Sequence, residues 1–306
     1  MAATTLLSAY AADRLIGDPS QFHPVAGFGR LARLLEQRIW QPTRRAGLVH
    51  TASLVGGVAA ASVLAERTLP ARLRPLFCAL LIWTALGGRS LERAALELAD
   101  AVDADDLARA RQLAPTLVGR DPTNLDAGEL CRAAVESVAE NTSDAVVAPL
   151  VWAALLGAPG VAGYRAANTL DAMVGHRGER YKRFGWAAAR LDDLLNWPPA
   201  RLTALAAIAW APAFGGDRRT AWRAAWRDGA AHPSPNAGRV EGAFAGALSL
   251  RLGGVNRYPH GLEQRPQLGD GDPPTSADVR RSVQLARLVG ASTLALCALL
   301  CRRRDG

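Results

Sequence analysis

Three carboxylates recur at every fourth residue in the stretch ESVAENTSDAVVAPL, which covers residues 136–150. At about 100° per residue in a helix, Glu136, Glu140 and Asp144 lie on one face, and an apolar run begins directly after them. Unpaired carboxylates at the edge of a bilayer are costly and tend to be functional. Grouped carboxylates there suit Mg²⁺, which proteins hold with one or two carboxylates plus substrate phosphates. The competing interpretation is the solvated face of an ordinary amphipathic helix.

A second polar segment, NTLDAMVGHRGERYKRFGWAAARLDDLLNWPPARL, covers residues 168–202. Four of its cations cluster within seven residues, namely Arg177, Arg180, Lys182 and Arg183, and the acidic pair Asp192-Asp193 follows them. A metal-bound phosphate needs both kinds of group, because cations neutralise the phosphate oxygens and carboxylates hold the ion. An interfacial helix whose arginines contact lipid headgroups explains the same residues equally well.

Glycine and proline divide this second segment. Gly175 and Gly178 predict a helix break around His176-Arg177. Pro198-Pro199 predicts the end of the short helix that carries Asp192, Asp193 and Asn196, because proline cannot continue the backbone ladder.

A third segment, HPSPNAGRVEGAFAGALSLRLGGVNRY, covers residues 232–258. Ser234-Pro235-Asn236 predicts a turn in which Ser234 or Asn236 caps the next helix, whose free N–H groups would attract an anion. Within that helix a tandem GxxxG permits close packing against a neighbour. Its members are Gly238, Gly242 and Gly246.

A capping box predicts where the helix with the acidic stripe begins. Asp126 is followed three residues later by Glu129, a spacing in which each side chain caps the other residue's backbone. Leu130, Ala134 and Val138 fall on the face opposite the stripe. The cluster Asn141-Thr142-Ser143 predicts a cap or turn at the other end.

Apolar runs indicate an all-α, multi-pass membrane protein with about four to six membrane segments and helical cytoplasmic loops. Five runs lack charge, and a sixth is broken by Pro212. They are residues 1–12, 48–65, 75–88, 145–164, 288–301 and 202–216. Only 48–65 and 145–164 approach the roughly 20 residues of a full span. The turn signal Gly157-Ala-Pro-Gly160 suggests that 145–164 is a helical hairpin.

Composition excludes several classes of protein. The formal charge is +8, but no basic run carries interleaved aromatics, which argues against nucleic acid as a partner. The four cysteines show no CxxC or Cys/His ligand spacing, so neither structural zinc nor a disulfide framework is predicted. There is no P-loop and no GxSxG nucleophile elbow.

Taken together, these blocks resemble the adenosylcobinamide-phosphate synthase family of cobalamin biosynthesis, the CobD/CbiB proteins. The matching blocks, in the family's order, are DRLIGDPSQFHPV (13–25), ESVAENTSDAVVAPL (136–150), NTLDAMVGHRGERY with FGWAAARLDDLLNWPPARLTAL (168–205) and SPNAGRVEGAFAGALSLRLGG (234–254). Small departures stand at Ala145, His176 and Gly178, where the family usually carries Gly, Tyr and Asn.

The resemblance implies a single multi-pass domain over residues 1–306 in the cell inner membrane, with its active site facing the cytoplasm. It implies ATP-dependent formation of an amide between aminopropanol, or its phosphate, and the free propionate of adenosylcobyric acid. Expected co-substrate and metal are ATP and Mg²⁺. Expected partners are the corrinoid, membrane lipid and other membrane enzymes of the vitamin B12 pathway.

On this resemblance we assign candidate roles to the polar residues. The catalytic candidates are Glu136, Glu140, Asn141, Asp144 and Asp171. The phosphate- or nucleotide-binding candidates are Arg177, Arg180, Arg183, Ser234 and Asn236. The metal-ligand candidates are Glu140, Asp144, Asp192 and Asp193. We expect all of them to gather in one charged pocket beneath the lipid.

Two rival functions remain. The first is a non-catalytic membrane sensor or transport protein related to the family. The second is a membrane prenyltransferase, because DDLLN at residues 192–196 resembles half of a DDxxD diphosphate motif. A prenyltransferase would need a second Asp-rich motif.

Overall fold

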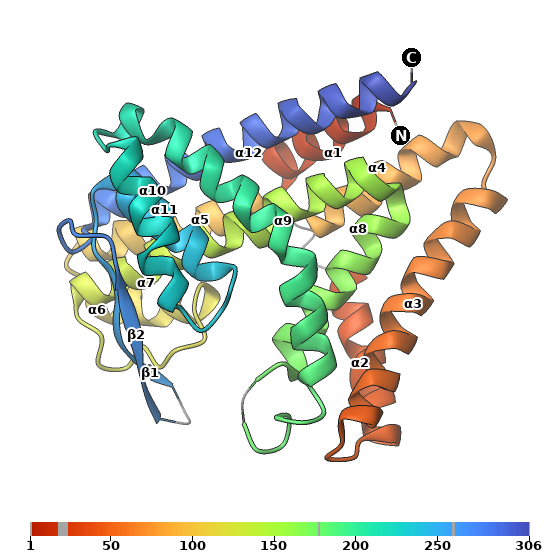
Figure 1. The fold of residues 1–306 in the computed structure, drawn as a ribbon, viewed down its shortest axis with the longest axis horizontal. Helices are drawn as coiled ribbons and strands as arrows, with labels where there is room; N and C mark the ends of the chain where they lie inside the picture. Colours follow the sequence, from red (N-terminus) through yellow and green to blue (C-terminus); the bar gives the residue numbers. More distant parts are fainter. Residues whose placement is uncertain (1, 18–23, 177, 259–260, 306) are drawn as a thin grey trace. The chain divides into compact units, whose positions relative to one another are not determined.

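A computed structural model describes residues 2–17, 24–176, 178–258 and 261–305, and its path is shown in Figure 1. The chain divides into two compact units. Unit 1 comprises residues 1–87, 148–196 and 294–306, and unit 2 comprises residues 88–147 and 197–293. His23 and the neighbouring residues of the first matching block lie outside the described residues.

Unit 1 is built from long helices. They are α1 (Ala3–Ile16), α2 (Pro24–Ile39), α3 (Arg44–Thr68), α4 (Arg74–Ala85), α8 (Ala148–Val174), the first part of α9 (Trp186–Trp210) and the end of α12 (Ser276–Asp305), with a 3₁₀ turn η1 (Ala71–Leu73). Helix α8 packs along α3 and also contacts α4 and α2. Leu54, Leu170 and Phe184 are buried together at the centre of one core cluster in this unit.

Unit 2 packs shorter helices around α7 and α11. Its helices are α5 (Gly88–Asp103), α6 (Leu107–Leu113), α7 (Ala127–Thr142), the rest of α9, α10 (Arg218–Trp226), α11 (Ala237–Leu248) and the first part of α12. Short turns are η2 (Ala114–Thr116), η3 (Ser143–Val147), η4 (Ala211–Phe214) and η5 (Asp228–Ala231). Strands β1 (Leu252–Tyr258) and β2 (Gly261–Leu268) form an antiparallel hairpin. The helical class is confirmed, and the hairpin is an element that the sequence did not predict.

Three helices are long and apolar enough to cross a membrane among the described residues. They span Arg44–Thr68, Ala127–Val174 and Ser276–Arg303, and they contain the predicted runs 48–65, 145–164 and 288–301. The runs at 1–12 and 75–88 form the 14-residue α1 and the 12-residue α4, which are too short by this criterion. The chain is therefore a helical protein of membrane type.

The turn signal at 157–160 produces a kink inside α8. Gly157 has φ 70° and ψ −151°, a conformation that favours glycine and divides α8 into two helical parts. The predicted break is confirmed, whereas the return of this segment as a hairpin stays a prediction.

Helix α7 begins as predicted and ends differently. The capping box is confirmed, because the Asp126 side chain accepts from Glu129 N–H and the Glu129 side chain accepts from Asp126 N–H. Of the predicted cap or turn at 141–143, the cap is present, because the α-helix ends at Thr142 with Ser143 in the C-cap position. The turn is wrong, since the chain continues through a π-helical segment at Ser143–Val147 into α8. Thr142 Oγ1 and Asn141 Nδ2 donate to the carbonyls of Val138 and Ser137, which accommodates these polar side chains within the helix.

The predicted stop at Pro198-Pro199 is also wrong, because α9 continues through both prolines to Trp210. A proline at position 199 leaves the carbonyl of Leu195 without its usual N–H donor. The indole Nε1 of Trp152 donates to that carbonyl at 3.0 Å, which replaces the lost bond.

The glycine stripe of α11 permits very close packing, as predicted. A Cβ atom at Gly242 would lie 2.5 Å from the carbonyl oxygen of Ala224, and one at Gly246 would lie 2.4 Å from the Cα of Ala221. Both neighbours belong to α10, so the α10–α11 contact requires these glycines.

Candidate functional site

Glu136 of α7 is buried and lies at the centre of an ion-pair network in unit 2. Its Oε2 accepts from Arg120 Nη2 at 2.7 Å, and its Oε1 lies 3.4 Å from Arg132 Nη1. The backbone N–H of Gly253 donates to the same Oε1 at 2.9 Å. Arg120 and Arg132 both also donate to Asn256 Oδ1, so the network joins α7 to strand β1. The solvated-face interpretation of the acidic stripe is therefore wrong at Glu136.

A second polar group lies around the buried carboxyl of Glu241 on α11. His232 Nε2 is 3.9 Å from Glu241 Oε1, and Arg265 Nη1 of β2 is 3.1 Å from the same ring nitrogen. His232 Nδ1 lies 3.1 Å from the backbone nitrogen and 3.3 Å from the carbonyl oxygen of Ser234. Because the guanidinium of Arg265 can only donate, a neutral His232 accepts at Nε2 and carries its hydrogen on Nδ1, which faces the Ser234 carbonyl.

Burial and like charges shift the proton affinities of this second group. The pKa of Glu241 is raised well above its usual value by burial and by the negative charges of Glu136 and Glu140. The pKa of His232 is lowered by burial and by the positive charge of Arg265. The pair is therefore poised to hold a proton on the carboxyl while the imidazole stays neutral.

Ser234 and Asn236 stand at the start of α11, where the sequence placed them. Ser234 Oγ accepts from the backbone N–H groups of Asn236 and Ala237, so Ser234 is the residue that caps this helix end. Asn236 is buried, and its Oδ1 accepts from Arg201 Nη1 of α9. Arg201 also donates to the carbonyl of Pro235 at 3.1 Å, which ties the turn to α9.

The remaining candidates on the acidic stripe follow Glu136 along the chain. Glu140 is exposed one turn later, and its charge acts on Glu241. Asn141 donates to Ser137, and Asp144 lies at the start of the π-helical segment. Single π-turns inside α-helices occur often at functional sites, in keeping with a site beside Glu136.

Unit 1 contains the other acidic group. Asp192 Oδ1 of α9 accepts from Asn168 Nδ2 of α8 at 3.3 Å. Burial, followed by the negative charge of Asp171, raises the pKa of Asp192 to about 7. Asp193 lies on the same helix and is 3.6 Å from Arg190 Nη1. The negative charges of Asp171 and Asp193 both act on Asp192, and metal binding by these residues stays a prediction.

The candidate arginines of unit 1 lie between α8 and α9. Arg180 Nη2 pairs with Glu36 Oε1 of α2 at 3.1 Å, and its guanidinium lies 4.7 Å from the ring centre of Trp40. Arg183 is exposed, and Arg177 lies outside the described residues. The helix break predicted around Gly175 and Gly178 is confirmed, because α8 ends at Val174 and α9 begins at Trp186.

The predicted residues therefore fall into two groups, one in each unit, and their meeting in one pocket stays a prediction. Within the described ranges, no three His, Cys, Asp or Glu side chains are grouped as a ready metal cage. The four cysteines are free and buried. A dication held by two carboxylates and completed by substrate phosphates needs no such cage. The like-charged pair Asp171 and Asp192 fits that need, because a cation would offset both the burial and the repulsion by Asp171 that raise the pKa of Asp192.

Sequence reasoning missed several members of the unit 2 site. They are Arg120, Arg132, His232, Glu241, Asn256 and Arg265. Glu241 left a signal that went unused, since it is the only carboxylate in a helix made otherwise of small and apolar residues with one arginine. Arg120 and Asn256 left none, because they lie in a loop and in a hairpin that local patterns do not specify.

The helices of membrane length and the buried ion-pair network define a helical protein of membrane type with a buried charged site. A family model described as CobD/CbiB protein matches residues 6–286, and the chain belongs to this family.

Curated relatives support the same assignment. The chain is 53% identical over 293 residues to "Cobalamin biosynthesis protein CobD" of Mycobacterium tuberculosis, which covers 95% of this chain and 93% of the relative. Proteins of the same name from Chromobacterium violaceum and Rhodobacter capsulatus are 45% and 41% identical, covering 89% and 87% of this chain and 88% and 85% of the relatives. No solved structure matches.

Proposed function

We propose that this chain acts in cobalamin biosynthesis as an adenosylcobinamide-phosphate synthase. It joins aminopropanol, or aminopropanol phosphate, to the free propionate of adenosylcobyric acid in an ATP-dependent ligation. The single observation that carries the proposal is 53% identity along 95% of the chain to a protein named for cobalamin biosynthesis. The buried network supports it, because a protein that only spans the membrane has no need of two guanidinium groups on the buried carboxyl of Glu136, or of a second buried carboxyl, Glu241, beside His232.

The reaction needs activation of an inert group. A propionate anion does not react with an amine, so its oxygen first takes the γ-phosphoryl group of ATP, which releases ADP. The amine nitrogen then attacks the carbonyl carbon of the acyl phosphate. The bond from carbon to the phosphate oxygen breaks, phosphate leaves, and the nitrogen loses one proton.

The residues of unit 2 meet two of these requirements. Glu136 acts as a positioning residue that holds Arg120 and Arg132, and such guanidinium groups stabilise charge that develops on phosphate oxygens. Glu140 is exposed, and its negative charge contributes to the raised pKa of Glu241. In this proposal Glu140 accepts the proton that the attacking amine loses.

The residues of unit 1 supply the metal and phosphate contacts. Asp192 with Asp171 would hold Mg²⁺, and when bound this ion neutralises the phosphates of ATP. Arg183 and Arg180 take the phosphate of the nucleotide or of the amine donor. The orientation toward the cytoplasm and the location in the inner membrane belong to the same proposal, because ATP and the corrinoid are cytoplasmic.

Complementation tests this function in cells. A cobalamin auxotroph blocked after cobyric acid should grow when this chain is expressed, and it should fail to grow with Glu140→Ala or Asp193→Ala. Glu97→Ala, which removes an exposed carboxylate of α5, is the matched control and should support growth. Absence of rescue by the wild-type chain, with the protein present in the membrane, would favour the sensor or transport alternative.

A further inference from the structure

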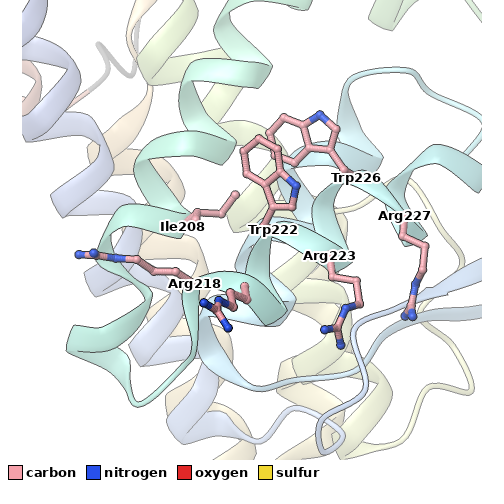
Figure 2. A pocket seen from close by; sticks show the side chains of 7 residues that line it. Ile208, Arg218, Trp222, Arg223, Trp226 and Arg227 are labelled. Atoms are coloured by element: carbon pink, nitrogen blue, oxygen red, sulfur yellow. The ribbon is translucent and has the colours of Figure 1, made fainter.

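Helix α10 lines an open groove of about 690 Å³ that the ligation chemistry does not use. Four arginines, two tryptophans and one isoleucine form it: Arg218, Arg219, Arg223, Arg227, Trp222, Trp226 and Ile208. Figure 2 shows the two indole rings side by side, with the side chain of Arg223 extending from α10 and that of Arg227 from the residue directly after it. The rings stack at a centroid distance of 4.2 Å and an angle of 5°.

Two of the four arginines use their guanidinium groups in contacts within the protein. Arg227 pairs with Asp228 at 2.6 Å and with Asp270 at 3.6 Å. Arg218 donates to the carbonyl of Ala209 at 3.1 Å. By contrast, Arg219 and Arg223 are exposed, and neither has an ion pair within 4 Å in the described part of the chain. The charge of Arg219 acts on Asp217, two residues earlier in the chain, and contributes to lowering the pKa of that carboxyl. Both guanidinium groups are therefore accessible to an external anion, and Arg223 is the one with no carboxylate beside it in the described ranges.

Two hydrogen bonds between α12 and the residues just before α10 place the groove near the point where α12 changes from charged to apolar. Arg281 Nη2 of α12 donates to the carbonyl of Phe214, just before α10, at 2.6 Å. Trp210 Nε1, at the end of α9, donates to Ser292 Oγ of α12 at 3.0 Å. Between these two tethers α12 changes character, because Arg287 is the last charged residue before the apolar run 288–301. In a helix of membrane length, this change marks the level of the lipid headgroups.

The side chains that line the groove are of the types expected at the level of the lipid headgroups. Arginine binds phosphate oxygens through its fork of N–H groups, and tryptophan is enriched where the bilayer meets water. The stacked pair uses one face of each indole, and the guanidinium of Arg239 lies 6.0 Å from the ring centre of Trp226. This arrangement favours an interfacial anchor over a platform for a nucleobase.

We propose that the groove formed by Arg219, Arg223 and the stacked Trp222–Trp226 pair binds the phosphodiester headgroup of an anionic phospholipid. The site is separate from the ligation chemistry and would exist in a protein of any catalytic function. It makes the lipid composition of the membrane a determinant of the stability of unit 2.

Lipid retention by the purified full-length chain tests this site. The protein is held in micelles that contain equal amounts of phosphatidylglycerol and phosphatidylcholine, and the retained lipids are counted by mass spectrometry. We expect the wild-type chain to enrich phosphatidylglycerol. Each of Arg219→Gln and Arg223→Gln should lower that enrichment about fivefold, since each removes one cation at the headgroup level. Arg109→Gln, an exposed arginine of α6 outside the groove, is the matched control and should leave it unchanged.

Two further measurements keep the outcome unambiguous. Thermal unfolding in phosphatidylcholine alone should be the same for the wild-type and groove variants, which shows that the variants fold. Equal retention of both lipids by the wild-type chain, or unchanged enrichment in folded groove variants, would overturn the proposal. Displacement of phosphatidylglycerol by inorganic phosphate or ATP at equal concentration would also overturn it, because the groove would then be a site for a free phosphate compound.

Discussion

Arg120 Nη2 donates to Glu136 Oε2 at 2.7 Å in the interior of unit 2, where the two side chains are only 3% and 11% exposed. Arg120 belongs to the loop before α7 and Glu136 to the middle of that helix, so the pair fixes the loop against the helix. Because both charged groups are buried away from water, each compensates the charge of the other. Removal of one therefore leaves an uncompensated buried charge.

Glu136→Ala should therefore destabilise the protein by about 3–5 kcal/mol. Glu136→Gln keeps an oxygen that accepts from Arg120 and should cost less. Thermal unfolding of both variants in detergent measures the difference. An alanine variant as stable as the wild-type protein would show that the buried pair contributes nothing.

Gly242→Ala should destabilise the protein by about 1–3 kcal/mol, because the new Cβ would lie 2.5 Å from the carbonyl oxygen of Ala224 and force α10 away from α11. The matched control is Gly56→Ala in α3, where a Cβ would have no neighbour within 4 Å. That control should be neutral or stabilising by up to about 1 kcal/mol, as expected of alanine in a helix. Equal unfolding temperatures for the two variants would contradict the close α10–α11 packing.

Asp192 predicts a loss of stability with rising pH. Its pKa is raised from 3.8 to about 7, so the folded protein holds this proton more tightly than the unfolded chain does. The contribution of this proton to the free energy of unfolding is fully present below pH 3.8 and is lost as the pH rises to about 7. Asp192→Asn should remove this slope. Unfolding temperatures of the two proteins across that range give the test, and parallel curves would show that Asp192 does not titrate there.

His232 predicts the opposite slope. Its pKa is lowered below 6.5, so the unfolded chain takes up a proton more readily than the folded protein. Its contribution is present above pH 6.5 and is lost as the pH falls through the folded-state pKa. His232→Gln should flatten this acid-side loss while leaving the slope assigned to Asp192. A variant with the same acid sensitivity as the wild-type chain would place the responsible group elsewhere.

Local signals predicted the parts of the fold that depend on neighbours in sequence. The capping box at Asp126 and Glu129 and the close-packing glycines of α11 are examples, since both depend on fixed short spacings. The passage of α9 through Pro198 and Pro199 was not predictable in this way. Its lost backbone bond is replaced by Trp152, which is distant in sequence.

The candidate site shows the same division. The helical period placed Glu136 on one face with Glu140, but it could not show that Arg120 from a loop and Gly253 from a hairpin would bury Glu136. Glu241 was overlooked because a single carboxylate in an apolar helix has no spacing to recognise. Contacts between residues that are far apart in the sequence decide which charged side chains are buried.

The central claim is that this chain forms an amide on a corrinoid acid with the energy of ATP. The most direct measurement is a reconstituted assay with purified protein in lipid, adenosylcobyric acid, aminopropanol phosphate and Mg-ATP, with the corrinoid product and ADP both quantified. We predict one ADP for each amide formed, with product lost in Glu140→Ala and Asp193→Ala and retained in Glu97→Ala. Amide formation that does not require ATP, or normal product in both acidic variants, would contradict the account.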